Sequence, residues 1–277
     1  MPASTACPSG RAQGPGLRGV CLRISDRDRS VAFYRDRLGM RVLREERCGD
    51  ARARLHLAFP TSSHGALAAA PATALVLEHG PALAGATLRS GRDHVYWKIG
   101  VTLSDVDRAR ARLLAAGERV SEPAQFEDIG YLCHLQDPDG YSIELLQRTF
   151  APPLGSPRPA AADDGSPLAE PGILGQITLR VRDIAASREL YERRLGMRLL
   201  SIQPVARYGF TLYFLAYTDE RPPEPDLRAV HNREWLWQRP YTTLELLHRD
   251  ARDLRMPDLP HSLGEDHGRD SWLRLRV

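Results

Sequence analysis

Alternating apolar and polar residues mark a series of short strands, and a helical pattern follows some of them. In residues 176–182, Ile177, Leu179 and Val181 alternate with polar side chains, which predicts a strand with one face against a core. Asp183 follows, and its carboxylate can cap a helix. Further short alternating stretches come after the helix. The order strand, helix and three strands predicts a βαβββ unit.

This unit is repeated along the chain. Residues 22–42 (unit one) and 179–199 (unit three) share apolar positions, the capping aspartate and a helix-ending glycine at a constant offset of 157 residues. A fainter copy, unit two, begins at Ile99, with Asp105 and Gly117 in the corresponding places. We therefore predict an α+β fold in which βαβββ units form curved mixed sheets.

Chain segments between the units suggest a division into domains. Residues 151–172 are rich in Pro, Ala and Gly, a composition that predicts a linker. The expected segments are a flexible tail (1–16), a first domain of two units (17–150), this linker, and a second domain (173–277) with one unit and the start of a further strand near Trp272. On this division, units one and two close one curved sheet together.

Charge and cysteine content exclude several classes of function. The chain has 277 residues and a net charge of +3, and Lys98 is its single lysine. The arginines alternate with acids, which argues against a nucleic-acid-binding surface. No apolar run approaches the length of about 18 residues that a membrane span needs. The cysteine spacing fits neither a zinc site nor a disulfide framework, which favours a cytoplasmic protein.

Several polar residues fall on the strand faces that look away from the helices. Gln176 and Arg180 lie on this face of one strand, Glu245 and Glu144 on two others, and Lys98 on a fourth. In a curved sheet this face is the concave one. A carboxylate there must be paired or metal-bound, because burying it alone is costly.

These patterns resemble the vicinal oxygen chelate superfamily, which includes glyoxalase I, extradiol dioxygenases and bleomycin-binding proteins. The resemblance rests on LGM after two helices and on DPDGYSIEL in unit two. Unit three, with QITLRV, LYFLAY and TLELLH, is similar to the first unit of eukaryotic-type glyoxalase I. The resemblance implies a divalent metal (Zn, Ni or Mg) bound by Gln176 and Glu245, with Glu144 as a further ligand. It also implies that Arg180 contacts a glutathione carboxylate.

The sequence departs from that family at several ligand positions. Lys98 stands where the family has a histidine, and a salt bridge between Lys98 and Glu144 would replace a metal there. Unit one has Gly19 and Val76 at two ligand positions, with Glu78 and His94 as nearby substitutes, and Arg249 replaces an asparagine.

The resemblance implies a lactoylglutathione lyase-type isomerase acting on a small carbonyl–thiol adduct through a metal-stabilised enediolate. Glu245 would be catalytic. Two alternatives stay open: a non-enzymatic binder of small molecules or antibiotics, and an extradiol ring-cleaving dioxygenase, which needs two histidines and one carboxylate around iron. Because the chain ends before a complete fourth unit, a homodimer is a source for the missing half of the unit-three site.

Overall fold

The computed structural model describes residues 16–48, 52–60, 73–85, 95–155, 163–249 and 271–276. Unit one contains β1 (Gly16–Arg23), α1 (Arg27–Asp36), β2 (Arg41–Cys48), β3 (Arg52–Ala58) and β4 (Ala74–His79). Unit two contains β5 (Tyr96–Leu103), α2 (Val106–Ala115), β6 (Ala124–Phe126), β7 (Gly130–Gln136) and β8 (Ser142–Gln147). The predicted βαβββ order is confirmed in both.

Unit three follows the same order with one addition. It contains β9 (Ile173–Val181), α3 (Ile184–Arg188) continuing as a π-helical segment (Glu189–Arg194), β10 (Arg198–Val205), a 3-10 turn (Ala206–Tyr208), β11 (Phe210–Ala216) and β12 (Thr243–Arg249). Between its last two strands lies a further helix, α4 (His231–Trp237). One more strand, β13 (Ser271–Arg276), lies where the start of a fourth unit was expected. None of the helices in the described part of the chain is long and apolar enough to cross a membrane.

The start and end of each unit's first helix are set by the residues that the repeat predicted. The carboxylates of Asp26, Asp105 and Asp183 each accept a hydrogen bond from the backbone N–H three residues later, at 3.0, 2.9 and 2.9 Å. Gly39 and Gly196 follow the helices of units one and three with φ of +78° and +73°. Only glycine adopts this conformation without strain, so it terminates the helix and turns the chain into the next strand.

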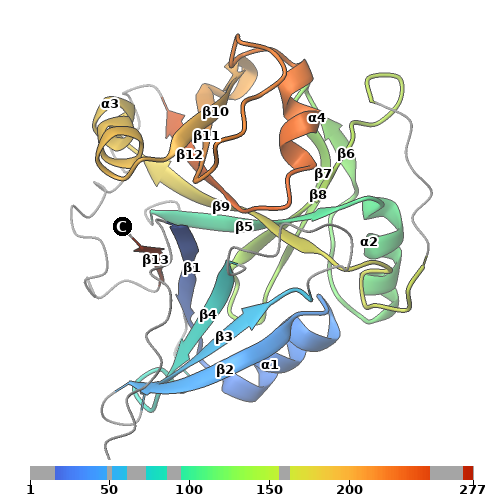
Figure 1. Ribbon diagram of the computed structural model, residues 1–277. Helices are drawn as coiled ribbons and strands as arrows, with labels where there is room; N and C mark the ends of the chain where they lie inside the picture. Colours follow the sequence, from blue (N-terminus) through green and yellow to red (C-terminus); the bar gives the residue numbers. More distant parts are fainter. Residues whose placement is uncertain are drawn as a thin grey trace, which may run out of the picture.

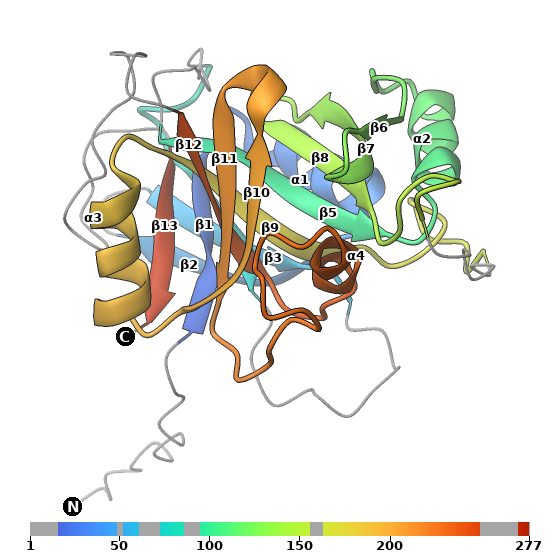
Figure 2. The ribbon, with the colours of Figure 1, turned by 90° about the horizontal axis from the view of Figure 1, so that it is seen from above.

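The strands form two sheets, and their pairing differs from the expectation (Figure 1). The five-stranded sheet has the order β13-β1-β4-β3-β2, and the eight-stranded sheet has the order β10-β11-β12-β9-β5-β8-β7-β6. Unit two therefore shares a sheet with unit three, through the antiparallel pair β5 and β9. Unit one pairs with β13 instead, which lies beside β1 in both views (Figures 1 and 2).

The expectation that units one and two close one sheet together is thus wrong. That expectation assumed that units adjacent in the sequence share a sheet. However, the first strands of any two units can pair if their edges are free. The segment 151–172 is long enough to carry unit three to the edge of unit two. Part of that segment also packs on unit two. Leu168 is buried, and the Glu170 carboxylate accepts hydrogen bonds from the backbone N–H groups of Ser104 (2.5 Å) and Asp105 (3.0 Å). The domain boundaries themselves stay a prediction.

One hydrophobic core joins all three units on the helix-bearing faces of both sheets. Its members include Leu22 and Leu57 of unit one, Ile99 and Leu145 of unit two, and Ile177 of unit three. Units one and two thus pack face to face without sharing a sheet. Burying such side chains stabilises the fold by roughly 1.5–3 kcal/mol each.

The turn between β7 and β8 fastens unit two to helix α1. The Asp137 carboxylate accepts hydrogen bonds from the Tyr34 hydroxyl (2.8 Å) and from the backbone N–H of Tyr141 (2.8 Å). Asp139 accepts from the Ser30 hydroxyl at 3.2 Å. Burial raises the pKa of Asp137 to about 6, although these donors oppose the shift. An Asp-Pro-Asp-Gly sequence is typical of a turn, but the role of its carboxylates as acceptors between units depends on the packing.

We expect Tyr34→Phe to lower the free energy of unfolding by about 1–3 kcal/mol, because it removes a donor to a buried carboxyl. Urea denaturation measures this change. Tyr208→Phe is the matched control, since Tyr208 is exposed and its substitution should leave stability unchanged. Equal stability of Tyr34→Phe and the wild type would show that the turn does not hold the units together.

Candidate functional site

A row of polar side chains crosses the concave face of the eight-stranded sheet. On β12 and β9, Glu245 lies opposite Thr178. Across the junction between β9 and β5, Thr178 lies opposite Lys98, and Gln176 opposite Gly100. On β5, β8 and β7, Gly100 lies opposite Glu144, which in turn lies opposite His134. We refer to Lys98, Glu144, Gln176, Thr178 and Glu245, all of them buried, as the central cluster. It combines residues of units two and three, which the β5–β9 pairing brings together.

Lys98 is the cation at the centre of this cluster. Its Nζ lies 2.5 Å from Glu144 Oε2 and 3.7 Å from Glu245 Oε2. Its side chain is only 5% exposed, and Nζ also lies 4.8 Å from the centre of the Trp97 ring. The salt bridge that the sequence suggested between Lys98 and Glu144 is confirmed, and it extends to a second carboxylate.

Gln176 is held between the two units. Its Nε2 donates to Glu144 Oε1 at 2.7 Å, which fixes the orientation of the amide because the opposite one would place two oxygens together. Its buried Oε1 has no hydrogen-bond partner among the described residues. Gly100 provides the space for this side chain, since a Cβ there would lie 2.3 Å from Gln176 Cγ. The cluster therefore contains one buried acceptor that a ligand hydroxyl could satisfy.

The two carboxylates have different environments. Glu245 accepts a hydrogen bond from the Thr178 hydroxyl at 2.5 Å. Burial raises the pKa of Glu245; the Lys98 ammonium opposes this shift, and the Glu144 carboxylate adds to it. Burial acts on Glu144 in the same direction, but Lys98 and His134 outweigh it and hold the pKa of Glu144 below its usual range. Paired carboxyls with divergent pKa values suit a division between a proton-transferring group and a permanently charged one.

The two carboxylates also keep the Lys98 side chain in its protonated, positively charged form. Burial would lower the pKa of Lys98, but the Glu144 and Glu245 carboxylates outweigh burial and raise it. The cluster thus holds two carboxyl groups, one firm positive charge and one amide.

With Lys98 in this position, the cluster does not fit a divalent metal. The three residues expected as ligands, Gln176, Glu144 and Glu245, do lie in one cluster, but Gln176 presents its amide nitrogen to Glu144. However, the ammonium already occupies the space against both carboxylates, and hard cations typically need about six donors. No group of three or more His, Cys, Asp or Glu side chains suited to a metal ion occurs among the described residues. The described part of the chain therefore also fails to assemble the two-histidine, one-carboxylate set that an extradiol dioxygenase needs.

His134 connects the central cluster to the surface. Its Nε2 lies 3.1 Å from Glu144 Oε2, while 43% of its side chain is exposed. It lines an open cavity of about 550 Å³ together with Ser142, Gln136, Leu135 and residues 117–119. A small molecule in this cavity would meet the buried charges at His134.

Helix α4 lies against the concave face and bridges the two units (Figure 1). The Trp237 ring packs edge-to-face on Phe214 of β11, 5.1 Å between centroids, and its Nε1 donates to the carbonyl oxygen of Ile129, before β7, at 3.0 Å. The backbone N–H of Phe150, after β8, donates to the Glu234 carboxylate at 2.7 Å. Trp237 is thus buried in a hydrophobic cluster on this face of the sheet.

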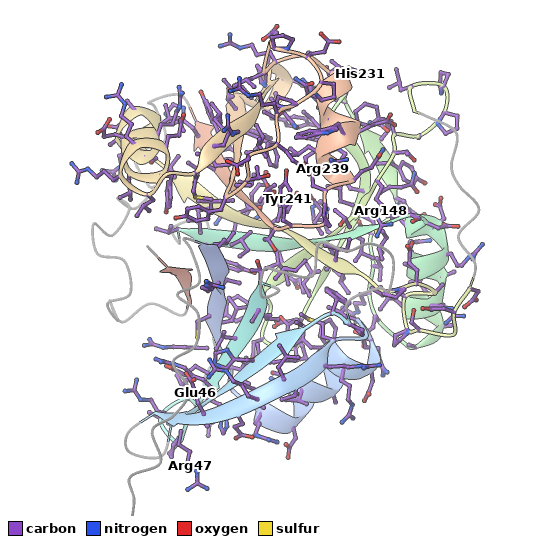
Figure 3. The ribbon with its side chains drawn as sticks, viewed as in Figure 1. Glu46, Arg47, Arg148, His231, Arg239 and Tyr241 are labelled. Carbon is purple, nitrogen blue, oxygen red and sulfur yellow. The ribbon has the colours of Figure 1, made fainter. Side chains whose placement is uncertain are left out.

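The segment after α4 continues this bridge. Figure 3 labels Arg239 and Tyr241 there, and Arg148 at the end of β8. Arg239 Nη1 and the Tyr241 hydroxyl each lie 3.1 Å from Glu220 Oε2. These contacts hold the chain between β11 and β12 over the sheet.

Arg180, the expected substrate-binding residue, lies beside the central cluster. Its guanidinium donates to the carbonyl oxygen of Tyr96 at 3.1 Å and lies 5.2 Å from the centre of the Trp97 ring. Arg180 and Lys98 thus both lie against the Trp97 ring, which brings a second positive charge close to the cluster.

The concave face of the five-stranded sheet carries a different set of residues. Glu78, a suggested substitute ligand, is buried, and Arg54 Nε donates to it at 2.6 Å. Gly19 cannot be replaced by a ligand, because a Cβ there would lie 1.9 Å from the carbonyl oxygen of Ala74. Glu46, labelled in Figure 3, lies 3.4 Å from His56 Nε2. His94 lies outside the described residues.

Sequence reasoning missed two members of the site. His134 alternates with buried Cys133 and Leu135, so the period of two along β7 could have placed it on the concave face. The role of Gly100 had no local signal, because it depends on the position of Gln176 across the sheet. The complementary half of the unit-three site, for which a second copy of the chain was one suggested source, comes from unit two of the same chain.

Comparisons with known proteins agree with this architecture. The profile of the Glyoxalase/Bleomycin resistance protein/Dioxygenase superfamily matches residues 16–145. A lactoylglutathione lyase from Haemophilus influenzae is 30% identical over 133 residues, which cover 46% of this chain and 87% of that protein. The crystal structure of glyoxalase I from Zea mays has a TM-score of 0.60 at 24% identity, over 85% of this chain and 68% of that one, which shows a shared fold.

Longer plant proteins match more of the chain. A lactoylglutathione lyase from Arabidopsis thaliana is 27% identical over 206 residues, 73% of this chain and 62% of that protein. A probable chloroplastic lactoylglutathione lyase from the same plant is 27% identical over 205 residues, and the chain spans 50% of its length. Through its βαβββ units, its sheet topology and these matches, the chain belongs to the glyoxalase/bleomycin resistance protein/dioxygenase superfamily.

Proposed function

We propose that this protein isomerises a small carbonyl–thiol adduct by proton transfer at the central cluster, a reaction of the lactoylglutathione lyase type. The observation that carries the proposal is the convergence of Glu245, Glu144, Gln176 and Lys98 at one buried point on the concave face. The names of the relatives support the same reaction class. No step of the proposed reaction passes through a metal, because the cluster with Lys98 in place does not fit one.

Glu245 is the proton-transferring residue of the proposed reaction. In a hemithioacetal, the carbon bearing sulfur carries one hydrogen and one hydroxyl, next to a carbonyl carbon. The Glu245 carboxylate removes the hydrogen as a proton, and the C–H electron pair forms a C=C bond while the carbonyl oxygen becomes negative. The proton then returns to the neighbouring carbon, where the C=C electron pair forms the new C–H bond. The hydroxyl proton moves to the negative oxygen, so that a thioester and a new hydroxyl result. The product is an isomer of the substrate, and no oxidant is consumed.

The raised pKa of Glu245 suits this role, because a carboxylate of higher pKa is a stronger base. Glu144 instead stays charged and holds Lys98 and Gln176 in place. Thr178 orients the Glu245 carboxylate through its hydroxyl. Arg180, beside Trp97, is the proposed contact for a carboxylate of the thiol part of the substrate.

We expect Glu245→Gln to lower kcat/KM for the hemithioacetal of glutathione and a 2-oxoaldehyde by about a hundredfold or more, since it removes the base. Ultraviolet absorbance follows formation of the thioester. Glu189→Gln is the matched control, because the Glu189 side chain is 46% exposed and lies outside the cluster. A wild-type protein that forms no thioester, or a Glu245→Gln variant as active as the wild type, would refute the proposal.

We expect Gly100→Ala to lower kcat/KM about tenfold and to lower the thermal unfolding midpoint by several degrees, while the variant still unfolds cooperatively. The added methyl would displace the Gln176 side chain and break its hydrogen bond to Glu144. Gly16→Ala is the matched control, since a Cβ there makes only ordinary contacts, at 3.5 Å or more from Arg18. Full activity of Gly100→Ala would show that the position of Gln176 is irrelevant to turnover.

A further inference from the structure

The single lysine of the chain lies at the centre of the site. Of 38 lysine and arginine residues, only Lys98 is a lysine, and its Nζ contacts one carboxylate at 2.5 Å and faces another at 3.7 Å. The rest of the positive charge is arginine, whose planar guanidinium could not present a compact point charge in this space.

We infer that the Lys98 ammonium takes the place of a divalent cation in this site, so that the protein binds and polarises a carbonyl oxygen with a fixed ammonium group. The part of this inference that concerns catalysis rests on the proposed function. The part that concerns what the cluster binds stands on the geometry alone.

The ammonium cannot readily move aside. Lys98 lies on β5, which pairs with strands on both sides, β8 and β9. Its side chain is 5% exposed and lies against the Trp97 ring. If it left, two buried carboxylates would lose their cation, and if it stayed, a divalent ion among the same oxygens would meet a positive charge at contact distance. Both outcomes are costly at a buried site.

The ammonium also has capacity for a substrate. A lysine ammonium carries three donors, and the described contacts are one hydrogen bond to Glu144 and a longer ion pair to Glu245. A further N–H can point at a substrate oxygen that becomes negative during proton transfer. A fixed donor of this kind stabilises such an oxygen because it needs no reorganisation during the reaction. The ligand class is therefore a small molecule with a carbonyl oxygen next to the reacting carbon.

Lys98→His tests what keeps a cation out. It replaces the ammonium by a neutral imidazole donor beside Glu144, Glu245 and Gln176. We expect Lys98→His to bind one zinc ion per chain at least about a hundredfold more tightly than the wild type, as measured by isothermal titration with zinc alone and by metal content after gel filtration. The bound zinc should be lost in Lys98→His combined with Glu245→Gln. Lys98→Arg, which keeps the positive charge, is the matched control and should bind no more zinc than the wild type.

Three outcomes would overturn the inference. The first is a wild-type protein that retains one zinc per chain and loses it on Glu245→Gln. The second is a folded Lys98→His variant, with the circular dichroism and unfolding transition of the wild type, that gains no zinc. The third is a Lys98→Arg variant that binds zinc as tightly as Lys98→His.

A separate measurement keeps this inference apart from the proposed function. Thioester formation by the wild type should be unchanged after exhaustive treatment with a chelator, and restored zinc should not increase it. Loss of activity on chelation would overturn the inference while supporting the reaction. Absence of activity under every condition would refute the reaction, and the zinc-binding results would still decide what Lys98 does.

Discussion

The antiparallel pairing of β5 with β9 is the constraint on which the site depends. It places Lys98 opposite Thr178 and Gly100 opposite Gln176, and so brings residues of two units within hydrogen-bond distance. The parallel pairs within each unit, β5 with β8 and β9 with β12, then add Glu144 and Glu245 from either side. Without this one junction, Glu245 of unit three would lose Lys98 of unit two as its counter-charge, and Gln176 would lose its hydrogen bond to Glu144.

Electrostatics then limits what the site can do. Two carboxylates and one ammonium are buried together. A buried ion pair adds little net stability, but removing one of its partners is strongly destabilising because the other charge is left buried without compensation. Lys98 neutralises Glu144 most directly, which leaves Glu245 as the carboxylate whose protonation is easier to change. The same arrangement that makes the cluster stable in the core thus distinguishes a structural carboxylate from a chemically useful one.

Local chemistry made much of the fold predictable. The aspartate caps, the helix-ending glycines and the alternation of strand residues follow from neighbours in the chain, so the three units and the concave face of Glu144, Gln176 and Glu245 could be predicted. The choice of partner strand could not, because the first strands of all units have equivalent edges. Likewise, α4 and its contacts with Ile129 and Phe150 depend on the curvature of the finished sheet. The lysine at the expected histidine position was visible in the sequence, but only the unit pairing shows that it faces both carboxylates.

A crystal structure of the wild-type protein grown with excess zinc, with anomalous diffraction collected at the zinc edge, tests the central claim most directly. We predict no anomalous peak among Gln176, Glu144 and Glu245, and density for the Lys98 ammonium in contact with Glu144. An anomalous peak bonded to Gln176 Oε1 and Glu245, with the Lys98 side chain displaced from the carboxylates, would contradict the account.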